Sequence, residues 1–237
     1  MPYRKNQFSN NKIYHIILRG IEDSLIFKDI DDYYRMIFSI YELNNATPTT
    51  IQRKREARKR FKKENRGPSS TVDERNKFVE ILSFCFMPNH IHLLLRQIKD
   101  AGITKFMSKV GTGYAGYFNR KYNRKGYVFQ NRFKDVYVED DDQLRTVFNY
   151  IHANPVSLIE PGWKENGIKD SDSAIKFLKE YKWSSYQDYN GQKNFPSVTQ
   201  RDFLINLVGG EGKCEEAVSD WIKYKERLNR FPEILLD

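Results

Sequence analysis

The feature that most constrains the fold is a pair of short apolar stretches separated by two turn residues. Residues 79–86 read VEILSFCF, and after Met87, Pro88 and Asn89 the chain continues as HIHLLL. Short stretches rich in aliphatic and aromatic residues are typical of strands, and Pro and Asn favour a turn between them. The simplest interpretation is two adjacent antiparallel strands.

Two further stretches predict strands on either side of this pair. Residues 12–18 read KIYHIIL, which is short and rich in Ile and aromatic residues. Residues 127–138 read YVFQNRFKDVYV and follow an expected turn at 123–126. Both patterns favour strands over helices because the runs are brief and bounded by turn residues.

Apolar residues at helical spacing predict helices between the strands. The first helix follows Asp29, a suitable N-cap, and the second begins near Ile103. A third has its N-cap among the acidic residues 140–142 and should end at Asn154, because Pro155 disfavours helical geometry in the residue before it. This order predicts an α+β fold with helices packed on one face of an antiparallel sheet.

A polar segment at about 44–76 interrupts the pattern. Between residues 53 and 66 it carries nine Lys or Arg and two Glu, so this stretch holds +7 of the net charge of +9. We interpret it as a basic insertion outside the core, either a solvated charged helix or an arm that binds phosphates. We expect the main domain over residues 1–160 and a C-terminal helical extension, packed on or appended to the core, over residues 161–237.

The composition indicates a globular protein. Hydrophobic residues make up 39% and aromatic residues 14%, which is enough for a core. Two cysteines, Cys85 and Cys214, are too few for a disulfide framework. Because the N-terminus lacks an apolar signal core and no apolar run is long enough to cross a bilayer, we expect a bacterial-type cytoplasmic protein without membrane contact. The positive charge favours a polyanionic partner.

Two of the four histidines flank a single isoleucine in the strand pair. In a strand, side chains alternate between faces, so His90 and His92 point to one side while Ile91 points to the other. Two imidazoles on one face can bind a divalent cation and leave positions for another side chain, water or substrate. Alternatively, the pair is simply part of a polar sheet face.

The helix expected up to Asn154 carries a second candidate pair. Tyr150 and Asn154 are four residues apart, so they share one flank of that helix. A tyrosine hydroxyl can form a covalent bond to phosphorus when a base or a metal assists it, and an amide oxygen suits a hard cation. Taken alone, a helical tyrosine is more often a packing residue.

Together, these motifs resemble a known family. MPNHIHLLL at residues 87–95 resembles the His-hydrophobic-His motif of HUH nucleases, and YIHANP at 150–155 resembles the tyrosine helix of single-tyrosine HUH transposases. The early Arg19-Gly20, the stretch YFNRKYNRKGYVFQNRFKD at 117–135 and the segment KWSSYQDY at 182–189 are similar to the REP-associated tyrosine transposase branch.

The resemblance implies a fold, a chemistry and a site. It implies a ferredoxin-like or RRM-like antiparallel sheet, with His90, His92 and Asn154 as ligands of Mg²⁺ or Mn²⁺ and Tyr150 as the nucleophile. In that family, the tyrosine attacks single-stranded DNA and forms a 5′-phosphotyrosine intermediate, and a second strand end resolves it. The implied partner is single-stranded or hairpin DNA, bound by a monomer or homodimer, with no nucleotide cofactor.

The basic segment and the exposed aromatics supply candidate contacts to DNA. The expected DNA-binding residues are Arg53, Lys54, Arg55, Arg58, Lys59, Arg60 and Arg132. Tyr122, Tyr127 and Phe129 are candidates for stacking on bases, although most of them are expected to fill the core instead. Two alternatives stay open: a domesticated protein that binds hairpin DNA without cutting it, and an RNA-binding module on the same sheet.

Overall fold

The computed structural model describes residues 8–47, 56, 59, 73, 75–130, 132–210 and 212–223. Within them, four strands form one sheet: β1 (Ile13–Arg19), β2 (Val79–Met87), β3 (His90–Gln97) and β4 (Lys134–Val138). The described residues also form the helices α1 (Ile30–Glu42), α3 (Gly102–Lys121), α4 (Asp141–Ala153), α5 (Trp163–Asn166), α6 (Ser171–Glu180), α7 (Tyr186–Tyr189), α8 (Asp202–Val208) and α9 (Lys213–Lys223). Short 3₁₀ turns lie at Ile21–Asp23 and Asn154–Leu158.

The sheet is antiparallel, with the strand order β2-β3-β1-β4. From β1 to β4 the elements run strand, helix, strand, strand, helix, strand, which is the ferredoxin-like arrangement. The predicted α+β class and strand pair are therefore confirmed. The register sets Ile17 of β1 and Cys85 of β2 opposite His92, so that both neighbours of β3 flank the histidine pair.

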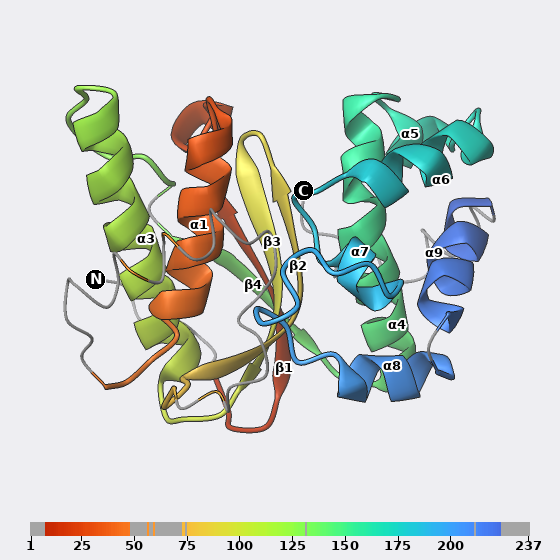
Figure 1. The fold of residues 1–237 in the computed structure, drawn as a ribbon, viewed down its shortest axis with the longest axis horizontal. Helices are drawn as coiled ribbons and strands as arrows, with labels where there is room; N and C mark the ends of the chain where they lie inside the picture. Colours follow the sequence, from red (N-terminus) through yellow and green to blue (C-terminus); the bar gives the residue numbers. More distant parts are fainter. Residues whose placement is uncertain are drawn as a thin grey trace.

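Helices cover both faces of the sheet, whereas the sequence predicted one covered face (Figure 1). α1 and α3 cover the face that carries Ile91, Leu93 and Leu95, and α4 covers the opposite face with Leu82 and Leu94. The reason is that β2 and β3 are apolar on both sides, so each face has to be buried. Alternation in β3 therefore places a second, smaller core beside the histidines.

The C-terminal helices extend this second core. α9 packs on α4 and on α6, and Trp163 and Trp221 lie in the same apolar cluster as the buried residues of α4. The expected extension thus packs on the core over its described part. The boundary at residue 160 stays a prediction.

The ends of two elements differ from the sequence prediction. Asp29 and Asp140 cap α1 and α4 as predicted, each accepting a hydrogen bond from the backbone three residues on. α4 ends at Ala153, but Asn154 keeps helical dihedrals of −51° and −39° and the chain continues as a 3₁₀ turn, so Pro155 tightens the helix rather than breaking it. β4 covers only the second part of the stretch 127–138 that was predicted as a strand. Before it, Phe129 forms an isolated bridge to Gly20.

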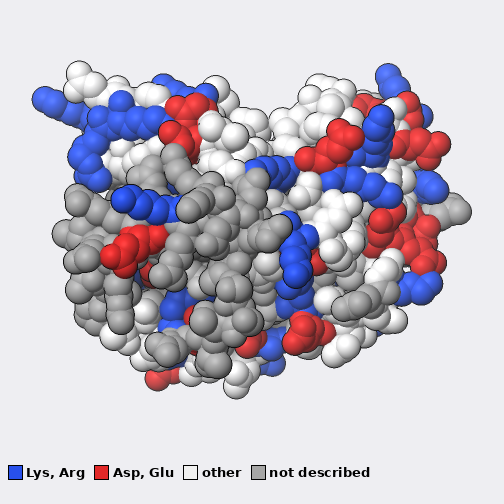
Figure 2. All heavy atoms as spheres, viewed as in Figure 1, with Lys and Arg blue, Asp and Glu red and all other residues white. Residues whose placement is uncertain are grey.

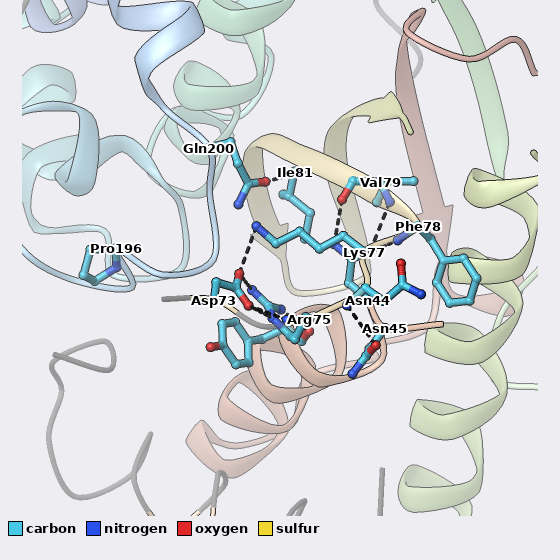
Figure 3. A network of polar contacts seen from close by, with 12 residues as sticks. Asn44, Asn45, Asp73, Arg75, Lys77, Phe78, Val79, Ile81, Pro196 and Gln200 are labelled. Carbon is cyan, nitrogen blue, oxygen red and sulfur yellow. Dashed lines mark hydrogen bonds and ion pairs between the residues drawn. The ribbon is translucent and has the colours of Figure 1, made fainter. Parts of the chain in front are cut away.

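The two ends of the expected insertion are held together by a polar network (Figure 3). Asn44, just after α1, accepts hydrogen bonds from the backbone of Phe78 and Val79 and donates one to the Val79 carbonyl at 2.8 Å. Asn45 Oδ1 accepts from the backbone of Asn76 at 3.2 Å. Most of segment 44–76 lies outside the described residues. Its two ends meet where α1 passes to β2.

No helix in the described part of the chain combines the length and the apolar character needed to cross a bilayer.

Gly20 is required by a close approach of backbone. A Cβ at this position would lie 2.2 Å from the Ser24 carbonyl oxygen and 3.2 Å from that of Asn89. We expect Gly20→Ala to reduce the free energy of unfolding by about 1–3 kcal/mol, as other overpacked sites do. Gly111→Ala in α3 is the control, because a Cβ at this position meets nothing within 4 Å. This substitution should stabilise the helix by roughly 0.5–1 kcal/mol. Urea unfolding measures both, and equal effects would contradict the steric explanation.

Candidate active site

The candidate site lies where three elements end or begin. β1 ends at Arg19, which is paired with His90 at the start of β3, and α4 approaches this end of the sheet with its last turn. In Figure 1 this is the end that also holds α5. Figure 2 shows the outline of the molecule indented there, between the part with α1 and α3 and the part with α5 and α6.

The two histidines and Asn154 converge on one point. His90 Nε2 lies 2.9 Å from His92 Nε2, and Asn154 Nδ2 lies 3.0 Å from the same His92 nitrogen. The three side chains are 8%, 0% and 1% exposed. The structure therefore places Asn154 beside the histidine pair, although Asn154 and His92 lie 62 positions apart in the sequence.

Neighbouring groups fix which nitrogen of each ring carries a hydrogen. His90 Nδ1 lies 2.6 Å from Asn89 Oδ1, so Nδ1 donates and Nε2 of the neutral ring keeps its lone pair. Because Asn154 Nδ2 can only donate, His92 Nε2 accepts, and His92 Nδ1 then donates to Nε2 of His15 at 3.0 Å. Two lone pairs thus face each other across 2.9 Å, an arrangement that a cation between them would stabilise.

Burial keeps both histidines neutral, as a metal ligand must be. Desolvation, followed by the charges of Arg19 and Lys164, lowers the pKa of His90 to about 3. Desolvation, followed by the neighbouring His90 and His15, holds the pKa of His92 well below its usual range. Neither ring is protonated near neutral pH.

The donor set is suited to a divalent cation. His90 Nε2 and His92 Nε2 are unprotonated, and a half-turn of the Asn154 amide would present Oδ1 instead of Nδ2. Among the described residues, no group of three or more His, Cys, Asp or Glu side chains is placed to hold a metal. The candidate donor set here consists of two histidines and an amide.

Tyr150 lies directly beside this group. Its ring is 5.7 Å from that of His92 and 6.0 Å from that of His15, both edge to face, and Trp221 packs on its other side at 6.3 Å. Tyr150 is 1% exposed, and burial raises the pKa of its hydroxyl above the usual value, while Asn154 and Arg19 act in the opposite direction. The hydroxyl is therefore a weak nucleophile unless another group takes its proton or stabilises the anion.

Two contacts of the site escaped the sequence analysis. His15 lies 77 residues before His92 and contacts it, and the sequence pattern gave it no role. Lys164, in α5, donates a hydrogen bond from Nζ to Tyr150 Oη at 3.0 Å. The two-residue period of a strand places His15 on the same face as Arg19, and this could have been inferred from the sequence. No local sequence pattern indicates that Lys164 contacts Tyr150.

Most of the expected DNA-binding residues lie in the basic segment between residues 53 and 66. Arg53, Lys54, Arg55, Arg58 and Arg60 lie outside the described residues. Lys59 and Arg132 are described and exposed. On the face shown in Figure 2, the described basic and acidic residues are intermingled.

Of the three aromatic candidates for base stacking, two contribute to packing, as expected for most of them. Phe129 is buried in the core, and the Tyr122 hydroxyl donates to the Asp32 carboxylate at 2.6 Å. Tyr127 is 79% exposed. It therefore remains available for stacking.

The comparisons with known proteins agree with the motifs. Residues 46–154 match the family model described as "Transposase IS200 like". This stretch, which is similar to the IS200-like transposases, contains both histidines, Tyr150 and Asn154. The resemblance to this family is therefore confirmed.

One solved structure similar to this chain is titled "Structure of the REP associates tyrosine transposase bound to a REP hairpin". It shares 14% sequence identity, with a TM-score of 0.44, and the match covers 85% of this chain and 93% of that chain. No curated protein matches the sequence.

Neutral buried histidines make the stability of the fold depend on pH. Burial lowers the pKa of His152 to about 3, against about 6.5 when unfolded, so the unfolded chain binds the proton first as pH falls. The contribution of the buried, neutral His152 to the free energy of unfolding is fully present above about pH 6.5 and is lost as the pH falls toward about 3. Replacing His152 by Gln should reduce the slope of unfolding free energy against pH, between pH 4.5 and 6, by about 1.4 kcal/mol per pH unit. Urea unfolding at several pH values measures the slope, and an unchanged slope would contradict the prediction.

Proposed function

We propose that this protein is a metal-dependent single-stranded DNA endonuclease and strand transferase, and that Tyr150 forms a covalent 5′-phosphotyrosine intermediate. The observation that carries the proposal is the convergence of Tyr150, Asn154 and the histidine pair from α4 and β3 at one end of the sheet. The IS200-like transposase domain over residues 46–154 supports the same chemistry.

His90, His92 and Asn154 are the proposed ligands of Mg²⁺ or Mn²⁺. When bound, the cation would polarise the scissile phosphate and offset the charge that develops on its oxygens. One of these ligands, Asn154, is the C-cap residue of α4, and the dipole at this end of a helix favours positive charge. His15 and Asn89 act behind them, since each hydrogen bonds the far nitrogen of a ligand ring and so fixes its orientation.

Tyr150 is the proposed nucleophile. The Asn154 backbone N–H donates to the Tyr150 carbonyl, so the helix holds the hydroxyl and the amide ligand one turn apart. In the forward step, Tyr150 Oη bonds to phosphorus, the P–O3′ bond breaks, and the DNA keeps a free 3′-hydroxyl. Because Tyr150 is 1% exposed, a DNA strand reaches it only after the surrounding side chains rearrange.

Hairpin-forming DNA is the proposed substrate. This choice rests on the family resemblance, on the net charge of +9, and on exposed groups suited to phosphates and unpaired bases, such as Arg132 and Tyr127. Whether a monomer or a homodimer acts on it stays a prediction.

The first test is the formation of a covalent adduct. Wild-type protein is incubated with labelled single-stranded hairpin DNA and Mg²⁺ or Mn²⁺, and products are separated under denaturing conditions. We expect an adduct that is absent in Tyr150→Phe and in the presence of chelator, because both the nucleophile and the metal are required. Tyr114→Phe is the matched control: Tyr114 is equally buried, but it lies on the opposite face and donates to the Ile26 carbonyl.

Other outcomes distinguish the alternatives. Hairpin binding by wild type without any adduct would favour the domesticated, non-cutting protein. An adduct that persists in Tyr150→Phe would exclude Tyr150 as the nucleophile. Equal binding of RNA and DNA with no need of His90 or Tyr150 would favour the RNA-binding module.

The second test is metal binding without DNA. Mn²⁺ binding followed by electron paramagnetic resonance should be lost in His92→Ala. In His15→Ala it should weaken about 10-fold to 100-fold, because the partner that orients His92 is removed. Tyr114→Phe again serves as the control. Equal affinities in wild type and His92→Ala would contradict the ligand assignment.

A further inference from the structure

A lysine faces the hydroxyl of Tyr150. Lys164 Nζ lies 3.0 Å from Tyr150 Oη and 4.9 Å from the centre of the tyrosine ring. The separation of 3.0 Å between Nζ and Oη is short enough for a proton to pass directly between the two atoms. Lys164 lies outside the stretch that matches the transposase family, 14 residues beyond Tyr150.

The local structure holds the lysine in place. α5 is a single turn that begins after Gly162, whose φ of 81° is accessible mainly to glycine. Its first residue, Trp163, is 1% exposed and packs edge to face on Trp221 of α9 at 5.7 Å. Trp221 also contacts the Tyr150 ring, so one tryptophan braces both the nucleophile and the helix that carries Lys164.

The surroundings of Lys164 favour its neutral form. Burial, followed by the positive charge of Arg19 from β1, lowers the pKa of Lys164 to about 8, while Glu165 and Cys85 act in the opposite direction. Arg19 is itself paired with Asp23 at 2.9 Å, which reduces its effect. The histidines of β3 are neutral and add no charge. A substantial fraction of Lys164 is therefore an uncharged amine at slightly alkaline pH.

We infer that Lys164 is a catalytic residue that accepts the phenolic proton of Tyr150 as the hydroxyl attacks the scissile phosphate. The inference rests on the proposed function and adds to it the group that activates the nucleophile. As the Oη–P bond forms, the proton passes to the lone pair of Nζ, and the electron pair of the P–O3′ bond leaves with the 3′-oxygen, which takes a proton from water. In rejoining, a 3′-hydroxyl attacks phosphorus and gives its proton to water, the P–Oη bond breaks, and the Lys164 ammonium returns a proton to the departing Tyr150 oxygen.

This role resolves a difficulty in the site. Burial raises the pKa of Tyr150, which makes the free hydroxyl a poorer nucleophile in the closed structure than in water. A positioned general base typically accelerates such a step by 10²-fold to 10⁴-fold. The ammonium form left behind is also close enough to stabilise the phenolate when the reaction reverses.

The test compares Lys164→Ala, Lys164→Arg and wild type in single-turnover adduct formation on the same hairpin DNA. We expect both variants to form the adduct 10²-fold to 10⁴-fold more slowly, with DNA affinity changed much less. Arginine keeps the positive charge but cannot accept a proton near neutral pH, so its failure separates proton transfer from charge. Lys176→Arg, at an exposed position on α6, is the control and should match wild type.

Two further readouts exclude a merely structural role. Added ethylamine should restore part of the rate in Lys164→Ala, because a small amine can occupy the vacated space. The wild-type rate should rise with pH and level off near pH 8, whereas Lys164→Arg should not level off there. Circular dichroism and hairpin binding confirm that the variants fold.

The outcomes separate the two proposals. Rates of Lys164→Ala or Lys164→Arg within about threefold of wild type would overturn the role of Lys164 while leaving Tyr150 as the nucleophile. A slow Lys164→Ala with no rescue by amine and an unchanged pH profile would show that the lysine only supports the structure. A wild-type protein that makes no Tyr150-dependent adduct would remove the proposed function, and the inference with it.

Discussion

The alternation of side chains along β3 is the constraint on which the rest of the structure depends. Ile91, Leu93 and Leu95 enter the larger core under α1 and α3, and this burial fixes the strand in its register. A shift by one residue would turn the apolar side chains toward α4 and the histidines into the core. The packing of one face therefore orients His90 and His92 on the other.

The second face becomes a site because it is covered as well. α4 buries apolar residues against Leu82 and Leu94, and the same helix brings Tyr150 and Asn154 over the histidines. Burial has two opposite effects here. It keeps the imidazoles neutral, which suits metal binding, and it raises the pKa of the tyrosine hydroxyl, which opposes attack. The proposed nucleophile, Tyr150, therefore needs a charged or basic group beside its hydroxyl, and Lys164 lies within hydrogen-bond distance of it.

Much of the fold could be predicted from local patterns. The strand pair, the N-caps at Asp29 and Asp140, and the place of the insertion follow from turn chemistry and apolar periodicity, which are properties of neighbouring residues. The sequence did not predict that helices cover both faces of the sheet, because a short apolar run indicates that a strand is buried but not which helix packs on it. The four proposed site residues could be singled out because they lie in two compact motifs. Their assigned chemistry came from the family resemblance, which the IS200-like domain supports.

The sequence by itself determined the side chains that share a face: His90 with His92 in a strand, and Tyr150 with Asn154 in a helix. These pairings depend only on the two-residue and 3.6-residue periods of regular structure. Only the tertiary structure decided that the two pairs meet, that His15 supports His92, and that Lys164 reaches Tyr150. Those contacts join residues between 14 and 77 positions apart. They are set by how the sheet, α4 and α5 pack, for which no local pattern in the chain provides a signal.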